Sequence, residues 1–220
     1  MDKPLLPVLF DALHAYAPNL FTSASKKRAR QPFKVNFQYN GDEIEATGRR
    51  GLNAFDLLTL EAVLYLAGRN AEPAANVALT EGLALEGDFK DAAHVWLKIS
   101  YAALARLMGR PCTGNFIARV KDSFHTLWSQ GFFIRNPNTQ IEGGFHLLSY
   151  SAKRGQVEVG LDPFLSRALV RERNYTLLSL TESRELSDPA RVLHLRLCNR
   201  AGKGEKTFFT RSQLQSVPWW

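Results

Sequence analysis

A regular alternation of apolar and polar residues between positions 33 and 47 predicts a β-hairpin. Alternate side chains of a strand face the same side of a sheet, which gives the pattern a period of two. Asn40-Gly41 lies at the centre, and this pair favours a two-residue type I′ turn because both of its central residues need positive φ. Ile44 and Ala46 continue the pattern after the turn. The apolar positions before it are Phe33, Val35, Phe37 and Tyr39.

Two segments before position 70 follow the helical period instead. Residues 5–20 have a one-sided apolar pattern, and Pro18 ends the predicted helix. Asn53 can cap a second helix over 54–67, which has a broad apolar stripe and a stop at Gly68. Residues 69–94 are rich in Ala, Gly, Glu and Asn, so we interpret them as an insertion or loop with room for a short helix.

The pattern from residue 95 to residue 130 is typical of a helix-turn-helix unit. A short apolar strand over 95–99 is followed by Ser100, a good N-cap for a helix over 101–108. Gly109-Arg110-Pro111 breaks the chain, and Thr113 can cap a longer helix over 114–130. A short helix, a tight turn and a longer helix in this order form the motif that places its second helix in the major groove of DNA.

Two further strands complete the prediction of a winged helix. We expect strands over 145–150 and 156–160, joined by a basic turn at Lys153-Arg154-Gly155. The order helix, strand, helix, turn, helix, strand, basic turn, strand is that of a winged helix-turn-helix domain in an α+β fold. We place it at residues 31–170, after an N-terminal helix and basic arm at 1–30.

The last fifty residues resemble the start of a second copy of this unit. Ser187 or Asp188 can cap a helix that ends near Gly202, and a strand over 206–209 and a helix capped by Thr210 come next. The order matches the first domain without its 69–94 insertion. We therefore interpret 171–220 as a linker and the beginning of a second, incomplete winged helix.

Composition narrows the class of protein and its partners. The chain has 220 residues, of which 45% are hydrophobic and 22% charged, and this is ordinary for a globular protein. No apolar run approaches a membrane span, and the start lacks the pattern of a signal peptide, so we expect a cytoplasmic protein without a membrane partner. The formal charge of +7 favours a polyanionic partner, and nucleic acid before any other.

We find no catalytic motif and no metal-ligand pattern in the sequence. His-Glu-x-x-His, Gly-x-Ser-x-Gly and a phosphate-binding loop are all absent. The five histidines are scattered, and the two cysteines, Cys112 and Cys198, cannot form a four-cysteine zinc site. We therefore expect neither enzymatic activity nor a cofactor.

The candidate functional residues are those that the predicted motif would bring to DNA. The start of a recognition helix meets base edges and phosphates, its N-terminus attracts phosphate, and a wing tip can reach the backbone or the minor groove. The alternative for each residue is a solvated charge on a helix that only packs, and winged helices also serve as dimer interfaces. The candidates are Arg110, Thr113, Asn115, Arg119 and Lys121 in the helix-turn-helix, Lys153 and Arg154 in the wing, and Lys26, Lys27, Arg28 and Arg30 in the basic arm.

Several of these stretches together carry a family resemblance. They are the basic residues 26–30, the hairpin, the segments 52–60 and 65–68, the helix-turn-helix and the wing, and the hairpin followed by Asp162-Pro163-Phe164-Leu165. Over most of residues 20–215 the chain resembles the replication initiator protein C family of IncQ-type plasmids. It is also similar to the wider class of plasmid initiators built from two winged helices.

The resemblance implies an origin-binding protein. Members of the family recognise directly repeated sites (iterons) in double-stranded DNA and help to open the origin for a replicative helicase. Members of the family use two winged helices to bind one repeat, and we expect this chain to lack the end of the second. The resemblance also implies that a second copy of the chain could be a partner, in a homodimer formed through the first winged helix. A winged-helix transcriptional repressor and a dimerising fragment that binds no DNA remain the alternatives.

Overall fold

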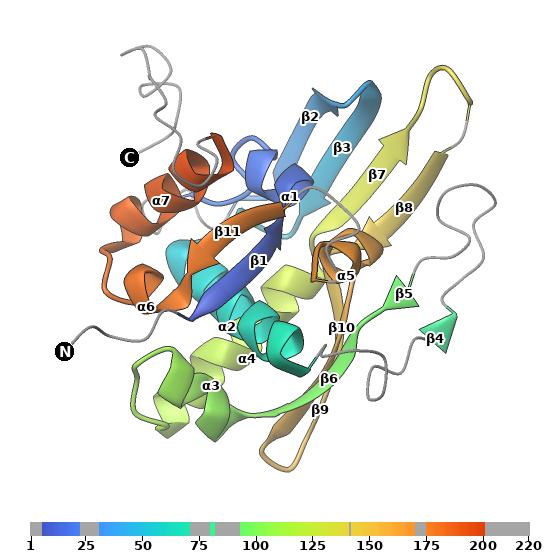
Figure 1. Cartoon of the computed structure of the whole chain (residues 1–220). Coiled ribbons are helices and arrows are strands. Elements are labelled where there is room, and N and C mark those ends of the chain that lie inside the picture. Colours follow the sequence, from blue (N-terminus) through green and yellow to red (C-terminus); the bar gives the residue numbers. More distant parts are fainter. Residues whose placement is uncertain are drawn as a thin grey trace.

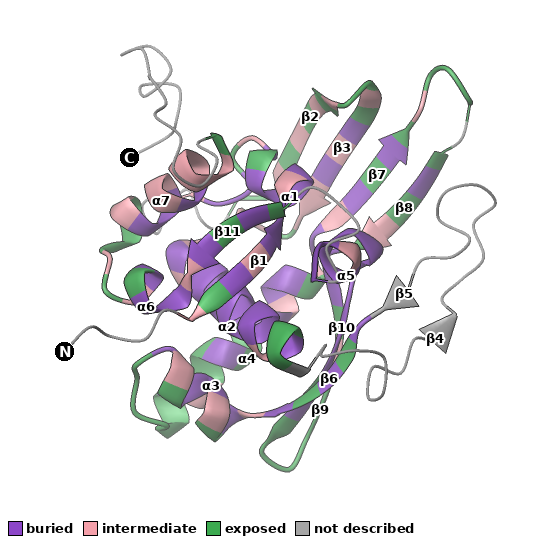
Figure 2. Cartoon of the chain, in the orientation of Figure 1, coloured by how far each residue is buried: buried purple, intermediate pink, exposed green. Residues whose placement is uncertain are grey.

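Helix α2 (Ala54–Asn70) is the element around which the others pack. The computed structural model describes residues 6–22, 31–70, 80–81, 93–140, 142–169 and 175–200, arranged as in Figure 1. Strand β1 and helices α3 to α7 all contact α2, and Figure 2 shows this helix buried along most of its length. Asn53 caps it as predicted, since Asn53 Oδ1 accepts from the N–H groups of Phe55 and Asp56. The predicted stop at Gly68 is wrong, because the helix continues to Asn70.

The winged helix lies around the lower end of α2 in Figure 1. Strand β6 (Trp96–Ser100) leads into α3 (Tyr101–Leu107), and α4 (Gly114–Trp128) follows after a turn. Strands β9 (Leu148–Lys153) and β10 (Gln156–Leu161) form the wing hairpin. Together with β6 they form a three-stranded antiparallel sheet in the order β6-β10-β9. The α+β winged-helix fold is thus confirmed. The predicted order of elements is not, because residues 131–135 and 142–146 form two strands of another sheet between α4 and the wing.

A four-stranded antiparallel sheet contains the predicted hairpin. Strands β2 (Phe33–Tyr39) and β3 (Asp42–Gly48) are joined at Asn40 and Gly41, whose φ values of 53° and 90° fit a type I′ turn. Strands β7 (Gly131–Arg135) and β8 (Glu142–His146) extend the sheet in the order β2-β3-β7-β8. The sequence analysis missed β7.

The single strand predicted over 145–150 is wrong. The chain leaves the four-stranded sheet at His146 and enters the wing sheet at Leu148, so two strands of different sheets meet there. Between them, Leu147 is fully buried, and its N–H donates to the carbonyl of Gln130 at 2.9 Å. No glycine or proline marks this break, which explains why the apolar run looked continuous.

The helix predicted over 5–20 is also wrong. Residues 7–11 form strand β1 (Pro7–Asp11), which pairs antiparallel with β11 (Tyr175–Ser179), and only α1 (Ala12–Tyr16) is helical. The spacing of the apolar residues fits both the helical period and the strand period of two. The strand forms because it pairs with β11 and because Val8 and Phe10 then both point into the core. Asp11 caps the short helix through its Oδ1.

The segment from β11 to residue 200 packs onto the other elements. Helix α6 (Leu180–Ser183) and α7 (Asp188–Arg200) follow β11, and both contact α2. Arg196 donates to the carbonyls of Ala15, Tyr16 and Ala17 at 2.6–2.9 Å and so binds the end of α1. The predicted helix beginning at residue 187 or 188 is present as α7, whereas the strand over 206–209 and the helix after it lie outside the described residues. In the insertion, the structure describes β4 (Thr80–Glu81) paired with β5 (Ala93–His94).

A buried histidine between two carboxylates joins α1 to α5 (Pro163–Leu169). His14 Nδ1 lies 2.9 Å from Asp11 Oδ1, and His14 Nε2 lies 3.6 Å from Asp162 Oδ2. Asp162 Oδ1 also caps α5 by accepting from the N–H groups of Phe164 and Leu165. Burial raises the pKa of Asp162 to about 7, and the charge of His14 opposes that rise. This cluster holds β1, α1 and α5 together.

Candidate nucleic-acid interface

The turn between α3 and α4 is fixed by hydrogen bonds at both of its ends. At the end of α3, Gly109 N–H donates to Arg106 O and Arg110 N–H donates to Ala105 O, which is the Schellman pattern of helix termination. Gly109 adopts the left-handed φ of +64° that this ending requires. At the start of α4, Thr113 Oγ1 accepts from Phe116 N–H at 3.2 Å. The intervening residues 109–113 are all exposed.

Helix α4 has one buried side and one exposed side. Val120, Phe124 and Leu127 are fully buried, and Phe124 stacks on Tyr150 of the wing with ring centres 5.7 Å apart. The helix therefore has a fixed rotation about its own axis. The opposite side is exposed along the first half of the helix and carries Asn115, Ala118, Arg119, Lys121 and Asp122.

Arg119 is held in place by an aromatic ring from another helix. Its guanidinium carbon lies 4.1 Å from the centre of the Phe55 ring, on the first turn of α2. A guanidinium that stacks through its face keeps its N–H groups available at its edge. Phe55 in turn lies against Phe116 of α4, edge to face, with ring centres 6.3 Å apart. Arg119 is therefore exposed and oriented at the same time.

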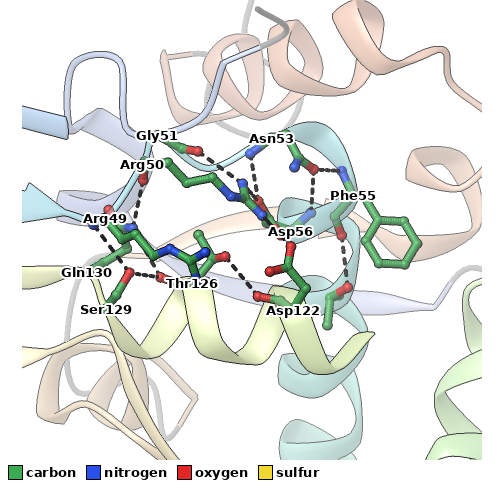
Figure 3. A network of polar contacts seen from close by, with 11 residues as sticks. Arg49, Arg50, Gly51, Asn53, Phe55, Asp56, Asp122, Thr126, Ser129 and Gln130 are labelled. Carbon is green, nitrogen blue, oxygen red and sulfur yellow. Dashed lines mark hydrogen bonds and ion pairs between the residues drawn. The ribbon is translucent and has the colours of Figure 1, made fainter. Parts of the chain in front are cut away.

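An ion-pair network that is buried at Asp56 and exposed at Asp122 joins α4 to the start of α2 (Figure 3). Arg50 lies 2.6 Å from Asp56 Oδ2 and 3.2 Å from Asp122 Oδ2. Burial raises the pKa of Asp56, although the ion pair with Arg50 opposes the rise. Asp122 is the acidic side chain on the exposed side of α4, and its pairing with Arg50 offsets its negative charge there.

A second part of the same network binds the end of α4. Gln130 Nε2 donates to the carbonyls of Arg50 and Thr126 at 2.9 and 3.1 Å. Arg49 N–H donates to Ser129 Oγ at 3.4 Å (Figure 3). The segment before α2 thus holds α4 both in its middle and at its C-terminal end.

The wing tip lies beside the start of α3. Arg154 and Gly155 have φ values of 43° and 80° and form the two central positions of the β9–β10 turn. Tyr101 N–H donates to the Gly155 carbonyl at 3.2 Å. The ammonium of Lys121 lies 5.9 Å from the centre of the Tyr101 ring. Lys121 of α4 and the exposed wing residues Lys153 and Arg154 therefore lie near the same point, the N-terminus of α3.

One known protein family matches nearly the whole chain. The family model described as Replication protein C (RepC) matches residues 4–218. The chain belongs to this family. Membership confirms the resemblance seen in the sequence and gives this RepC-family chain a role in the initiation of replication.

A solved structure of two domains of RctB resembles the RepC-family chain in fold. The crystal structure of selenomethionine derivatives of domains 2 and 3 of RctB superposes with a TM-score of 0.58 at 13% identity, over 94% of this chain and 76% of the RctB chain. A crystal structure of RctB domains 2-3, RctB-155-483, gives a TM-score of 0.47 at 14% identity, over 73% and 60% of the two chains. A comparison with curated proteins finds no match.

The structure places seven of the predicted residues of this RepC-family chain on the helix-turn-helix and the wing. Arg110, Thr113, Asn115 and Arg119 lie along the turn and the first half of α4, and all four are exposed. Thr113 uses its oxygen as a cap, which leaves its hydroxyl hydrogen able to donate. Lys121, Lys153 and Arg154 lie beside the start of α3. The basic arm, Lys26, Lys27, Arg28 and Arg30, is outside the described residues.

Sequence reasoning missed the residues that support this surface in the RepC-family chain. Arg50 and Phe55 contact α4, yet both precede it by more than fifty positions. The adjacent Arg49-Arg50 pair was a visible signal, but its carboxylate partners could not be identified from spacing. Among the described residues, no group of His, Cys, Asp and Glu could hold a metal ion, and no helix is long and apolar enough to cross a membrane.

Proposed function

We propose that the protein initiates plasmid replication by binding directly repeated duplex sites at the origin. The observation that carries this proposal is the exposed first half of α4, where Arg119 is oriented by Phe55 and Asp122 is offset by Arg50. A helix of this kind fits the major groove of B-DNA, and its N-terminal residues meet the bases first. Membership of the RepC family supports the link to replication.

Each side chain has a defined part in the proposed complex. Arg119 donates to guanine or to a phosphate, and Asn115 pairs with adenine or a phosphate. Thr113 and Arg110 bind the backbone at the N-terminus of α4, where the helix dipole favours negative charge. Lys153 and Arg154 bind the backbone or the minor groove on the other side.

A mobility-shift experiment tests the proposal. The full chain is titrated against a duplex containing the origin repeats of its plasmid and against a scrambled duplex of equal length, at one fixed salt concentration. We expect the repeat duplex to bind at least tenfold more tightly, since specific sites usually exceed non-specific DNA by far more than this. Equal affinity for the two duplexes would overturn sequence-specific recognition.

The later steps are proposals that rest on the first. We propose that bound protein helps to open the origin and to load a replicative helicase, and that it does so as a homodimer in the cytoplasm. Plasmid maintenance in cells that lack the gene separates an initiator from a winged-helix repressor, because loss of a repressor would leave replication intact. Sedimentation of the free chain and of its DNA complex measures the oligomeric state.

A further inference from the structure

An arginine from a distant part of the chain lies over the turn of the helix-turn-helix. A Cβ atom placed on Gly109 would lie 3.7 Å from Cδ of Arg184, an ordinary van der Waals contact. Arg184 directly follows α6, so more than seventy residues of chain separate it from this turn. Its apolar stem therefore packs on the backbone that joins α3 to α4.

A buried guanidinium fixes the segment that carries Arg184. Arg191 is 3% exposed, and its Nε donates to the carbonyl of Ser183 at 2.7 Å while its Nη2 donates to the carbonyl of Leu186 at 2.8 Å. These two carbonyls flank Arg184 on both sides. Nη1 of Arg191 also donates to the carbonyl of Ala54, the first residue of α2, at 3.2 Å. The position of Arg184 is thus set by the same helix that orients Arg119.

Positive charge gathers at this turn from two segments. Arg106 and Arg110 stand on either side of Gly109 in sequence, and both are exposed. Two of the carboxylates near Arg184 in sequence have partners of their own, since Glu182 lies 3.6 Å from His194 and Asp188 lies 3.1 Å from Arg191. The third, Glu185, directly follows Arg184 and is exposed. Within the described residues, no ion pair or hydrogen bond engages the Arg184 guanidinium.

We propose that Arg184, with Arg106 and Arg110, binds a backbone phosphate of duplex DNA beside the groove that α4 enters. This inference rests on the proposed function and extends its interface to the segment after α6. In helix-turn-helix complexes the first helix crosses the DNA backbone, so the end of α3 and the turn face phosphates. A guanidinium offers paired N–H donors that match phosphate oxygens. The contact adds affinity but no base preference.

Substitutions of Arg184 test the proposal by changes in salt dependence. Arg184→Met keeps an apolar stem over Gly109 and removes the charge, whereas Arg184→Lys keeps the charge. Binding of the repeat duplex and of the scrambled duplex is measured by fluorescence anisotropy across a salt series. For Arg184→Met we expect the slope of log K against log salt to become shallower by about 0.9. This corresponds to roughly an eightfold loss of affinity for both duplexes near 0.1 M salt. Arg184→Lys should keep the slope.

A matched control removes an equal charge elsewhere. Arg135 is an exposed arginine of β7, in the other sheet, and Arg135→Met should leave the slope unchanged. Phosphate-ethylation interference then locates the contact: Arg184→Met should lose sensitivity at one backbone position flanking the α4 site and keep it elsewhere.

The outcomes separate this inference from the proposed function. If the wild-type chain binds neither duplex, the proposed function fails. If the wild type binds the repeats and Arg184→Met gives the same slope, affinity and interference pattern, the Arg184 contact alone is refuted. Thermal unfolding of each variant shows whether the fold is kept. If Arg184→Met is destabilised, its loss of affinity supports the phosphate contact only when Arg184→Lys restores the affinity, and it refutes the contact otherwise.

Discussion

The guanidinium of Arg119 stacks on the ring of Phe55, 4.1 Å from its centre. The two residues come from different helices, α4 and α2, and the contact limits the directions in which Arg119 can point. An exposed pair of this kind contributes about 0.5–1 kcal/mol. Its larger effect concerns the DNA contact that we propose for Arg119, which would cost less side-chain freedom because the guanidinium is already oriented.

Substitution of Arg119 should weaken specific binding. For Arg119→Ala we expect a loss of about 1–3 kcal/mol on the repeat duplex and a much smaller loss on scrambled DNA, because a base contact carries the sequence preference. Phe55→Leu should give a smaller loss in the same direction, since the arginine remains but is no longer held by a ring. Titrations by anisotropy measure both variants. An Arg119→Ala protein with unchanged repeat affinity would exclude the residue from base recognition.

Substitution of Lys153 should act on all DNA sequences alike. The residue is exposed at the wing tip, where it can reach a phosphate. We expect Lys153→Ala to weaken repeat and scrambled duplexes by the same factor and to lower the salt slope by about one unit. A salt series measures this, with the exposed Lys34 of β2, which pairs with Glu45, as the site of a control alanine. An unaltered slope would mean that the wing tip does not contact DNA.

The two carboxylates that pair with Arg50 should respond differently to its loss. Asp56 is 1% exposed, so Arg50→Met leaves a buried carboxylate without its cation and should lower the free energy of unfolding by about 3–5 kcal/mol. Asp122 has 59% of its side chain exposed, so Asp122→Asn should change stability little. Removing its negative charge should nevertheless strengthen DNA binding. Urea unfolding and anisotropy measure the two effects, and weaker DNA binding by Asp122→Asn would contradict the electrostatic argument.

Glu61 should make the stability of the chain depend on pH. It is buried in the middle of α2, and burial raises its pKa to about 8, with the nearby Ser183 hydroxyl and the charge of Arg191 opposing the rise. Between about pH 4.5 and 8 the folded chain holds a proton that the unfolded chain has released. The free energy of unfolding therefore falls as pH rises through this range.

Glu61→Gln should remove this contribution. The amide has the same shape and no charge, so the variant should gain on the order of a few kcal/mol over the wild type at pH 8 and little at pH 4.5. Chemical unfolding across the pH range measures the difference. Asp162→Asn is a useful comparison because burial raises the pKa of Asp162 from 3.8 to about 7. Its effect on the free energy of unfolding therefore falls in a lower pH range than that of Glu61. A constant difference between Glu61→Gln and wild type at all pH values would contradict the expectation.

The helix-turn-helix was predictable from the sequence because its signals are local. Ser100 and Thr113 accept hydrogen bonds from the third residue of the helices they cap, and Gly109 ends α3 in the left-handed conformation. Each of these requirements acts within a few residues, so a single sequence shows them. The same holds for the hairpin turn at Asn40-Gly41.

The elements that were missed depend on distant partners. Residues 7–11 fit a helical period, and only pairing with residues 175–179 makes them a strand. Strand β7 exists because β3 offers it an edge. For the same reason the ion pair of Arg50 with Asp122 and the contact of Arg184 with Gly109 could not be inferred from spacing along the chain.

The pairing of β1 with β11 also affects synthesis. The first strand of the fold finds its partner only after residue 179 has left the ribosome, and translation proceeds at about 5–20 residues per second. For on the order of ten seconds or more, the apolar side of β1 has no strand beside it, while the turn and caps of the helix-turn-helix can already form. The nascent chain therefore passes through a stage in which its helix-turn-helix can form before the closure that completes the core, and this is when it is most exposed to aggregation.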